Sequence, residues 1–320
     1  MGVSMRFVCF LALLPALFFA GCSRQAPAAE GAPAALHEVA LQPGGSAGSV
    51  PASGAGVASG AGGASGDLPA AVAEDAAGYM GFFSTVLRAA ELPQDLYLSI
   101  LNSMTTSADF ILDLMAIMEG DPSLWRLVDK DRSLPNGYSP GDLVELVGGS
   151  YSVSRPGLML RRGAAASLEE MAAAARADGV TLVAASAYRS FQNQVQVHNH
   201  WVQVLGREEA ERVSARPGHS EHQLGLALDF APINTFFAQT REGVWLDANA
   251  ARFGWSLSYP YGFEDVTGYS WEPWHFRYVG RELVAFINNH FDGIQQFALR
   301  FIYEWEKAAA GSPAGEAHGG

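Results

Sequence analysis

One short segment, PGHSEHQLGLALDF, combines histidines and a carboxylate with a run of large apolar side chains. The apolar side chains occupy every second position from Leu224 to Phe230, which predicts a strand with one face in a core. The opposite face carries two small residues and Asp229, so it leaves space beside a single carboxylate. A buried carboxylate without a partner is costly, and Asp229 is therefore expected to pair with a base or to bind a metal.

His222 is the nearest candidate partner for Asp229 in a metal site. It lies seven residues before Asp229, which in a straight strand is roughly 23 Å, too far to share an ion. The chain must therefore bend between them, and Gly225 is the residue best able to allow a bend.

A catalytic zinc site has three protein ligands and an open position for water, so a third ligand is needed. His275 lies in the aromatic-rich segment WEPWHFRYV, with Glu272 three residues before it. A carboxylate beside a ligand histidine suits metal-assisted hydrolysis, because a base must take a proton from the bound water. A buried Asp–His hydrogen bond and a structural Glu–His pair would explain the same residues, so both alternatives stay open on spacing alone.

Four motifs in order resemble the LAS metallopeptidases, and within them the VanY-type D-alanyl-D-alanine carboxypeptidases and the related L,D-carboxypeptidases. The similarity extends from about Leu127 to Trp305. The motifs are LVDKDRSLPNGYSPGDLVEL, SAYRS, the segment S-x-H-x-x-G-x-A-x-D within PGHSEHQLGLALDF, and EPWHFRYVG. The resemblance implies an α+β fold, with a mostly antiparallel sheet, flanking helices and a zinc cleft.

The resemblance also implies roles for the matching residues. The zinc ligands would be His222, Asp229 and His275. Glu272 would act as general base and acid, and Arg189 would stabilise the oxyanion of the tetrahedral intermediate.

Three further polar residues lie in the matching motifs. Gln194 and Ser220 resemble positions near the terminal carboxylate of the substrate. His219 occupies a position that the family varies, so we interpret it as a rim residue and not as a ligand.

The elements that must position these residues follow from local patterns. Val180–Ala187 predicts a buried strand, and Ser190 is placed to cap the next helix. In that helix His198 falls on the apolar face and is expected in the core, while His200 is expected in solvent.

Residues 70–126 predict a small helical region before the peptidase domain. The apolar residues recur at helical spacing in two stretches separated by Pro93. We expect the zinc carboxypeptidase domain at residues 127–306, helical after Gly280, and a disordered tail at 307–320.

The N-terminus resembles the signal of a bacterial lipoprotein. Arg6 precedes an apolar stretch that is too short to span a membrane comfortably, and the chain then reads Phe-Ala-Gly-Cys up to Cys22. We therefore predict a signal peptide at residues 1–21, a lipid on Cys22, and a flexible Ala/Gly/Ser/Pro tether at 22–69. An ordinary signal peptide cut nearby, leaving a free thiol, is the alternative.

The bulk charge and the motifs together define the expected function. The formal net charge of −13 disfavours a nucleic-acid groove, which usually carries a basic patch. We expect an exported, lipid-anchored zinc carboxypeptidase that removes the C-terminal D-alanine from peptidoglycan stem peptides, facing the periplasm or cell wall. The alternatives are an endopeptidase or a D,D-dipeptidase with the same zinc chemistry, and a non-catalytic cell-wall-binding lipoprotein.

Overall fold

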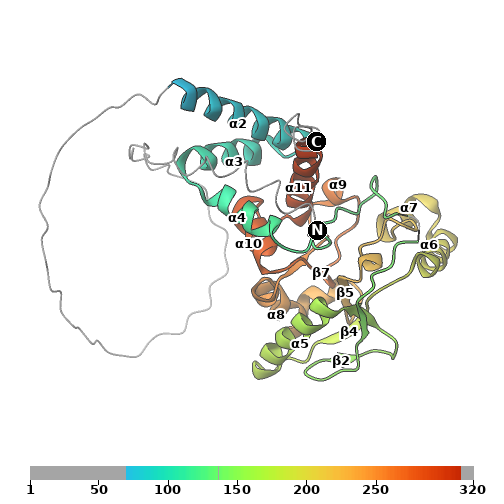
Figure 1. The fold of residues 1–320 in the computed structure, drawn as a ribbon. Helices are drawn as coiled ribbons and strands as arrows, with labels where there is room; N and C mark the ends of the chain where they lie inside the picture. The colour runs from blue at the N-terminus through green and yellow to red at the C-terminus, as the bar shows by residue number, and fades with distance from the viewer. Residues whose placement is uncertain (1–69, 136, 311–320) are drawn as a thin grey trace, which may run out of the picture.

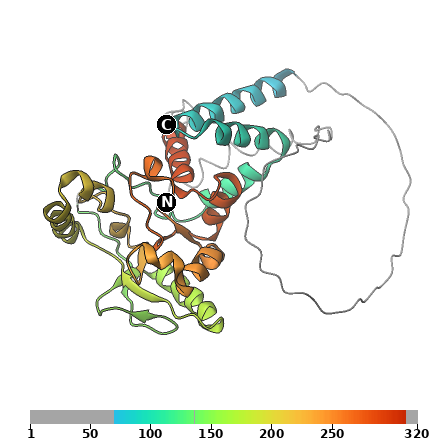
Figure 2. The same ribbon diagram turned by 180° about the vertical axis from the view of Figure 1, so that it is seen from behind.

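A computed structural model of the protein describes residues 70–135 and 137–310. The predictions of a signal peptide, a lipidated Cys22 and a tether lie outside the described residues. Within them, the chain forms a sheet half and a helical layer, which occupy opposite ends of the molecule (Figures 1 and 2).

The sheet half is built on five short strands. In spatial order they are β2 (Ser152–Val153), β4 (Val183–Ser186), β5 (Ala227–Phe230), β7 (His275–Tyr278) and β6 (Trp255–Leu257). The β2–β4 pair is parallel and the other three pairs are antiparallel. A separate antiparallel pair joins β1 (Leu143–Glu145) to β3 (Met159–Arg161). The predicted α+β fold with a mostly antiparallel sheet is confirmed.

Helices and turns connect and flank these strands. They are α5 (Arg162–Ala177), α6 (Phe191–Leu205), α7 (Arg207–Val213), η2 (Glu221–Leu224), η3 (Thr235–Gln239), α8 (Arg241–Asn249), η4 (Ala250–Phe253) and α9 (Glu264–Thr267). The apolar face of α5 joins Leu228, Phe230 and Phe276 of the sheet in one buried core. Burial of this face fixes α5 against the sheet, and it leaves the polar residues of β5 and β7 on the sheet's other side.

The helical layer is formed by both ends of the described chain. Its elements are α2 (Ala70–Ala89), α3 (Gln94–Thr106), α4 (Asp109–Met118), α10 (Arg281–His290) and α11 (Gln295–Ala310). They share one core, whose buried rings include Phe83, Phe110, Phe286, Phe291, Phe301 and Trp305. The region predicted as a helical unit at 70–126 is helical, but it does not pack by itself. Its apolar stripes are covered by the two C-terminal helices of the peptidase region, because short helices need a partner face to bury theirs.

Three predicted boundaries differ in the structure. The strand predicted at Val180–Ala187 is shorter, at Val183–Ser186. Leu224 lies in the η2 turn, and the strand begins at Ala227. α11 continues to Ala310, so residues 307–310 of the predicted tail are helical.

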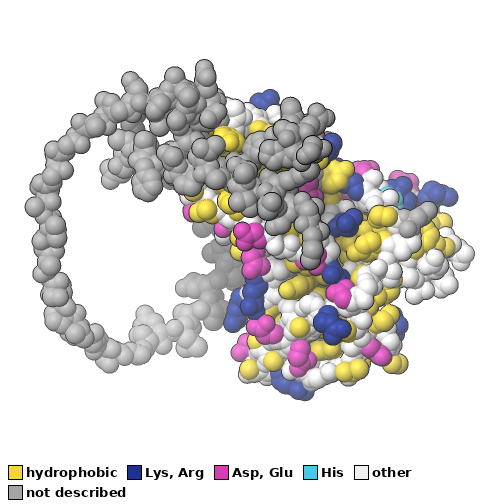
Figure 3. Space-filling model, viewed as in Figure 1, with side chains coloured by type: hydrophobic (Ala, Val, Ile, Leu, Met, Phe, Trp, Pro, Cys, Tyr) yellow, Lys and Arg dark blue, Asp and Glu magenta, His cyan; other side chains and the backbone are white. Residues whose placement is uncertain are grey.

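Helix hydropathy and surface charge bear on contacts with a membrane or with other molecules. No single helix among the described residues is long and apolar enough to cross a membrane; α3 and α4 meet that test only as a pair bent by 99°. On the face seen in Figure 3, acidic and basic side chains are interspersed.

Candidate active site

The sheet itself brings two of the predicted ligands together. Asp229 on β5 and His275 on β7 are directly opposite each other in the antiparallel register, and Ser186 on β4 faces Asp229 from the other side. Opposite residues in such a pair project to the same face, so these three side chains form a row across the sheet. Their neighbours Leu228 and Phe276 point the other way, into the core.

The η2 turn brings His222 to the same place. Gly225 ends the turn in the left-handed conformation with φ of 69°, where a Cβ atom would come within 2.9 Å of Leu143. The left-handed conformation favours glycine there, and a larger residue would also have to displace the Leu143 side chain. The predicted bend is confirmed, and His222 Nε2 lies 3.1 Å from the Asp229 carboxylate.

The three side chains have the geometry of a metal site. One ligand atom from each of His222, Asp229 and His275 lies within 4.8 Å of the others, and all three residues are buried. His222 Nδ1 is 2.8 Å from the carbonyl oxygen of Ala187, so this nitrogen carries the proton and Nε2 is free to bind a metal. His275 presents Nδ1 to Asp229 at 2.9 Å and turns Nε2 to Glu221 at 3.1 Å. Two imidazole nitrogens and a carboxylate oxygen are a common donor set for zinc.

Electrostatics favour a cation at this position. Burial lowers the pKa of His275, but its bonds to Asp229 and Glu221 outweigh burial and raise that pKa to about 10. Burial opposes ionisation of Asp229 as well, yet the two histidines hold its pKa well below the ordinary range. The negative charge that would hold a proton here would equally stabilise a metal ion.

Glu221 is a candidate functional residue that the sequence reasoning missed. Its Oε1 accepts from Arg277 Nη1 at 2.8 Å and from Gln295 Nε2 at 2.9 Å, while Oε2 faces His275. Burial raises the pKa of Glu221, but Arg277 and His275 outweigh it and lower that pKa to about 2. The ionised carboxylate fixes the ring orientation of His275, as carboxylates behind metal-binding histidines commonly do. Its position next to His222 in the sequence was the only available signal.

Glu272 lies beside the three ligand residues without belonging to their cluster. Its Oε2 is 3.7 Å from His275 Nδ1, and its backbone N–H donates to the carbonyl of Tyr259 at 3.0 Å. Burial, together with the charge of Asp229, outweighs the attraction of His275 and raises the pKa of Glu272 to about 8. A carboxyl group with a pKa near neutrality can both accept and return a proton.

Arg189 is held rigidly at the edge of the same site. Nη1 donates to Gln194 Oε1 at 2.9 Å, Nη2 donates to Ser186 Oγ at 3.0 Å, and Nη2 is 4.0 Å from Asp229. Burial lowers the pKa of Arg189, and the nearby Asp229 and Glu272 counter that effect. The predicted cap by Ser190 is present, with its hydroxyl accepting from Asn193 N–H at 3.2 Å, and it sets the start of α6.

The remaining predicted residues differ in their surroundings. Gln194 is 0% exposed, and its amide joins Arg189 to the carbonyl of Ala215, so the geometry favours a role in holding Arg189. Ser220 is buried where η2 begins, and its substrate contact stays a prediction. His219 faces the carbonyl of Asp129 at 2.7 Å, away from the ligand cluster, as expected of a residue that is not a ligand.

The histidines of α6 lie where the sequence indicated. His198 is buried and His200 is exposed.

Tyr259 is a second residue that the sequence reasoning missed. Its ring centroid lies 4.8 Å from that of His275 and 4.7 Å from that of Tyr269. Burial and the Glu221 carboxylate raise the pKa of Tyr259 well above its ordinary value, so the phenol stays protonated and available as a donor.

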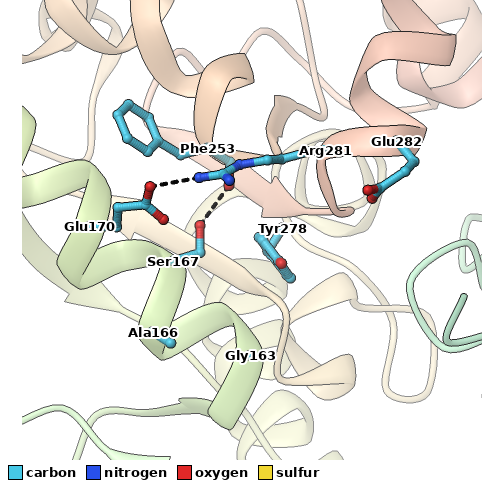
Figure 4. Close-up of a pocket in the computed structure, with 8 residues that line it drawn as sticks. All are labelled: Gly163, Ala166, Ser167, Glu170, Phe253, Tyr278, Arg281 and Glu282. Carbon is cyan, nitrogen blue, oxygen red and sulfur yellow. Dashed lines mark hydrogen bonds and ion pairs between the residues drawn. The ribbon is translucent and has the colours of Figure 1, made fainter.

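A separate pocket lies behind the sheet and contains none of these residues (Figure 4). It is bordered by α5, η4 and the start of α10. Two of its polar side chains are paired with other residues of the lining: Arg281 with Glu170 at 2.7 Å, and Ser167 Oγ with the carbonyl of Phe253 at 2.6 Å. We assign no chemistry to this pocket.

Comparisons with known proteins agree with the geometry. The family model VanY, described as D-alanyl-D-alanine carboxypeptidase, matches residues 157–281. YodJ of Bacillus subtilis, which carries a carboxypeptidase name, is 35% identical over 186 residues, covering 56% of this chain and 68% of that protein. A D-alanyl-D-alanine carboxypeptidase of Enterococcus faecalis is 40% identical over 124 residues, but these make up only 36% of this chain and 46% of that enzyme.

Two solved structures are also similar in sequence. The LD-carboxypeptidase LdcB is 34% identical, with a TM-score of 0.49, over 56% of this chain and 85% of that one. A mutant of the vancomycin-resistance D,D-pentapeptidase VanY, solved with Zn(II), is 32% identical, with a TM-score of 0.46, over 55% and 98% of the two chains. Because the chain covers more than two thirds of a relative that is 35% identical to it, and because it matches the VanY family model, it belongs to the VanY-type D-alanyl-D-alanine carboxypeptidases.

Proposed function

We propose that this protein is a zinc carboxypeptidase that removes the C-terminal D-alanine from peptidoglycan stem peptides. The observation that carries the proposal is the convergence of three metal-binding atoms, from His222, Asp229 and His275, beside a carboxyl group that is not one of them. Metal-assisted hydrolysis needs this combination, since the metal holds the water and a separate base handles its proton.

The protein's own groups divide the work of hydrolysis. His222, Asp229 and His275 would hold zinc, which when bound lowers the pKa of a water molecule and polarises the scissile carbonyl. Glu272 would take a proton from the attacking water and return it to the departing amine of D-alanine; its raised pKa suits both roles. Arg189 donates to the oxyanion that develops on the carbonyl oxygen.

The hydrogen bonds that hold Arg189 in place support its role as a donor to the oxyanion. Gln194 and Ser186 fix its guanidinium before substrate arrives, so little reorganisation is needed in the transition state. Gln194 thus acts on the reaction indirectly, by positioning Arg189.

The test is mass spectrometry of synthetic stem tetrapeptides and pentapeptides after incubation with the zinc-loaded full chain. We expect the loss of a single D-alanine from one or both peptides. Release of a D-Ala-D-Ala dipeptide from the pentapeptide would favour the D,D-dipeptidase activity instead. No cleavage of any peptide at full zinc occupancy would leave the non-catalytic wall-binding role.

We also propose that the enzyme is exported and anchored to a bacterial membrane by a lipid on Cys22, so that it faces the periplasm or cell wall. The support is the apolar stretch that ends in Ala-Gly-Cys and the Ala/Gly/Ser/Pro segment that follows. Cys22→Ser should release a soluble protein into the aqueous phase of a detergent partition. Partition of this variant with the detergent, as for the wild type, would contradict the anchor.

A further inference from the structure

Arg155 lies level with the edge of the active site. β2 pairs with β4 in parallel, with Val153 beside Ala184. The last backbone bond between the two segments joins Ser154 N–H to the carbonyl of Ala184, and Arg155 is the next residue. On β4, Ser186 follows two residues after Ala184, and its hydroxyl accepts a hydrogen bond from Arg189. Arg155 therefore follows the strand that borders the row of active-site residues.

The backbone on both sides of Arg155 is fixed. Ser154 N–H donates to the carbonyl of Ala184 at 2.9 Å, and Ser154 Oγ donates to that of Ala185 at 3.3 Å. After Pro156, Gly157 N–H donates to the Glu145 carboxylate at 3.0 Å. A side chain on such a segment can bind a ligand without the cost of ordering a loop.

The charge of Arg155 has no counterpart in the described part of the chain. Its side chain is exposed, and no carboxylate within residues 70–135 and 137–310 forms an ion pair with it. Arg155 is close enough to Arg189 to act on it, because the positive charge of Arg155 adds to burial in lowering the pKa of Arg189. In a chain with 33 acidic and 20 basic residues, two adjacent arginines with one left unpaired form a site suited to an anion.

Arg189 is already assigned to the oxyanion, which leaves a second anion to another cation at this edge. Two of its five N–H groups also donate to Gln194 and Ser186, which fix its position. The free guanidinium at this edge is that of Arg155, and its planar fork matches a carboxylate.

We propose that Arg155 forms a carboxylate-binding subsite, which selects peptides that carry a free carboxylate on the amino side of the scissile bond. This inference rests on the proposed function and narrows its substrate class. In a stem peptide two groups have this chemistry: the α-carboxylate of the D-glutamate residue, and the extra carboxylate of a diamino diacid at the third position. A lysine at the third position would present only an ammonium group, which Arg155 repels.

The experiment compares four sets of synthetic peptides in a two-by-two design, each set consisting of a tetrapeptide and a pentapeptide. The third residue is meso-diaminopimelate or lysine, and the D-glutamate α-carboxylate is free or amidated. The enzymes are the zinc-loaded full chain, Arg155→Ala and Arg207→Ala. Arg207 is a matched control, since it is also exposed and forms no ion pair with a described residue.

We expect the wild-type kcat/KM to be higher for peptides that carry the carboxylate that Arg155 binds. For those peptides, Arg155→Ala should lower kcat/KM roughly three- to tenfold, mainly by raising KM. The peptide that lacks both carboxylates should be unaffected by Arg155→Ala, and Arg207→Ala should match the wild type throughout. The preference should shrink in high salt, because the contact is exposed. Whichever carboxylate loses its advantage in Arg155→Ala identifies the group that Arg155 binds.

If the wild type and Arg155→Ala show the same relative kcat/KM among the four peptide sets, the proposed subsite is wrong. Calorimetric titration of the same peptides separates this result from a failure of the proposed function. If no D-alanine is released but binding still prefers the carboxylate in an Arg155-dependent manner, the subsite stands and the hydrolytic function fails. If binding shows no such preference either, the subsite is wrong.

Discussion

The two halves of this molecule bury very different side chains. Behind and around the sheet, several ionisable residues are almost completely inaccessible, among them Glu221, His222, Asp229, His275 and Arg277. The core of the helical layer is instead apolar, with a cluster of aromatic rings joining α2, α4, α10 and α11. Buried charges are costly and seldom add net stability, whereas apolar burial supplies most of it. The contrast indicates that the sheet half is organised for chemistry and the helical layer for stability.

The two halves nevertheless meet behind the three proposed metal ligands. Gln295 at the start of α11 donates to Glu221, and Arg277 Nη2 donates to the carbonyls of Leu124 and Arg126, each at 2.9 Å. The segment after α4 and the first residue of α11 thus hold the two residues that orient His275. Stability supplied by the apolar half can in this way fix the geometry of the polar half.

The largest effect should follow from removing a ligand in the sheet half. His275→Ala should lose its zinc and all measurable turnover, because two ligands do not hold zinc tightly. The helical layer should still give a helical circular dichroism spectrum. Zinc stoichiometry and D-alanine release are the measurements, with the exposed His200→Ala as a control that keeps both. Full zinc occupancy in His275→Ala would remove the third ligand from the account.

A smaller effect should follow from changing the residue behind that ligand. Glu221→Gln keeps the shape but not the charge that holds His275, so zinc affinity should fall about 10- to 100-fold. Competition with a chelator measures the affinity. Glu209→Gln, which alters an exposed ion pair with Arg212, should leave it unchanged. Wild-type zinc affinity in Glu221→Gln would mean that the contact between Glu221 and His275 has only a structural role.

The smallest effect on catalysis should come from the helical layer. Leu114→Ala removes a fully buried side chain from its core and should lower the free energy of unfolding by about 2–5 kcal/mol. The kcat per zinc-loaded molecule should stay the same. Urea unfolding of this variant is compared with that of Leu112→Ala, an exposed position on the same helix that should change stability by less than about 0.5 kcal/mol. A fall in kcat alongside the loss of stability would contradict the separation of chemistry in the sheet half from stability in the helical layer.

Much of the site could be predicted from local patterns. The alternation from Leu224 to Phe230 placed Asp229 opposite the apolar face, and the need for a bend pointed to Gly225. These features are set by neighbours in the chain, which periodicity and glycine conformation describe well.

What could not be predicted depends on contacts between distant residues. Glu221 is 54 residues from His275 and 74 from Gln295, so no local spacing reveals that it is buried between them. The same holds for the helical layer: residues 70–126 show helical periodicity, but that pattern does not say that α10 and α11 cover their apolar faces. Tertiary packing decides which amphipathic faces meet.

The most direct test of the account concerns Glu272, which is assigned as a base and not as a ligand. Zinc content and steady-state D-alanine release should be measured together for Glu272→Gln. We expect full zinc occupancy and a fall in kcat of about 10²–10⁴, because the amide cannot accept the proton of the water. Arg189→Lys, measured alongside, should also keep its zinc and lose rate, since an ammonium lacks the planar donors of a guanidinium. A Glu272→Gln protein with near wild-type turnover would contradict the mechanism, and one without zinc would make Glu272 a ligand.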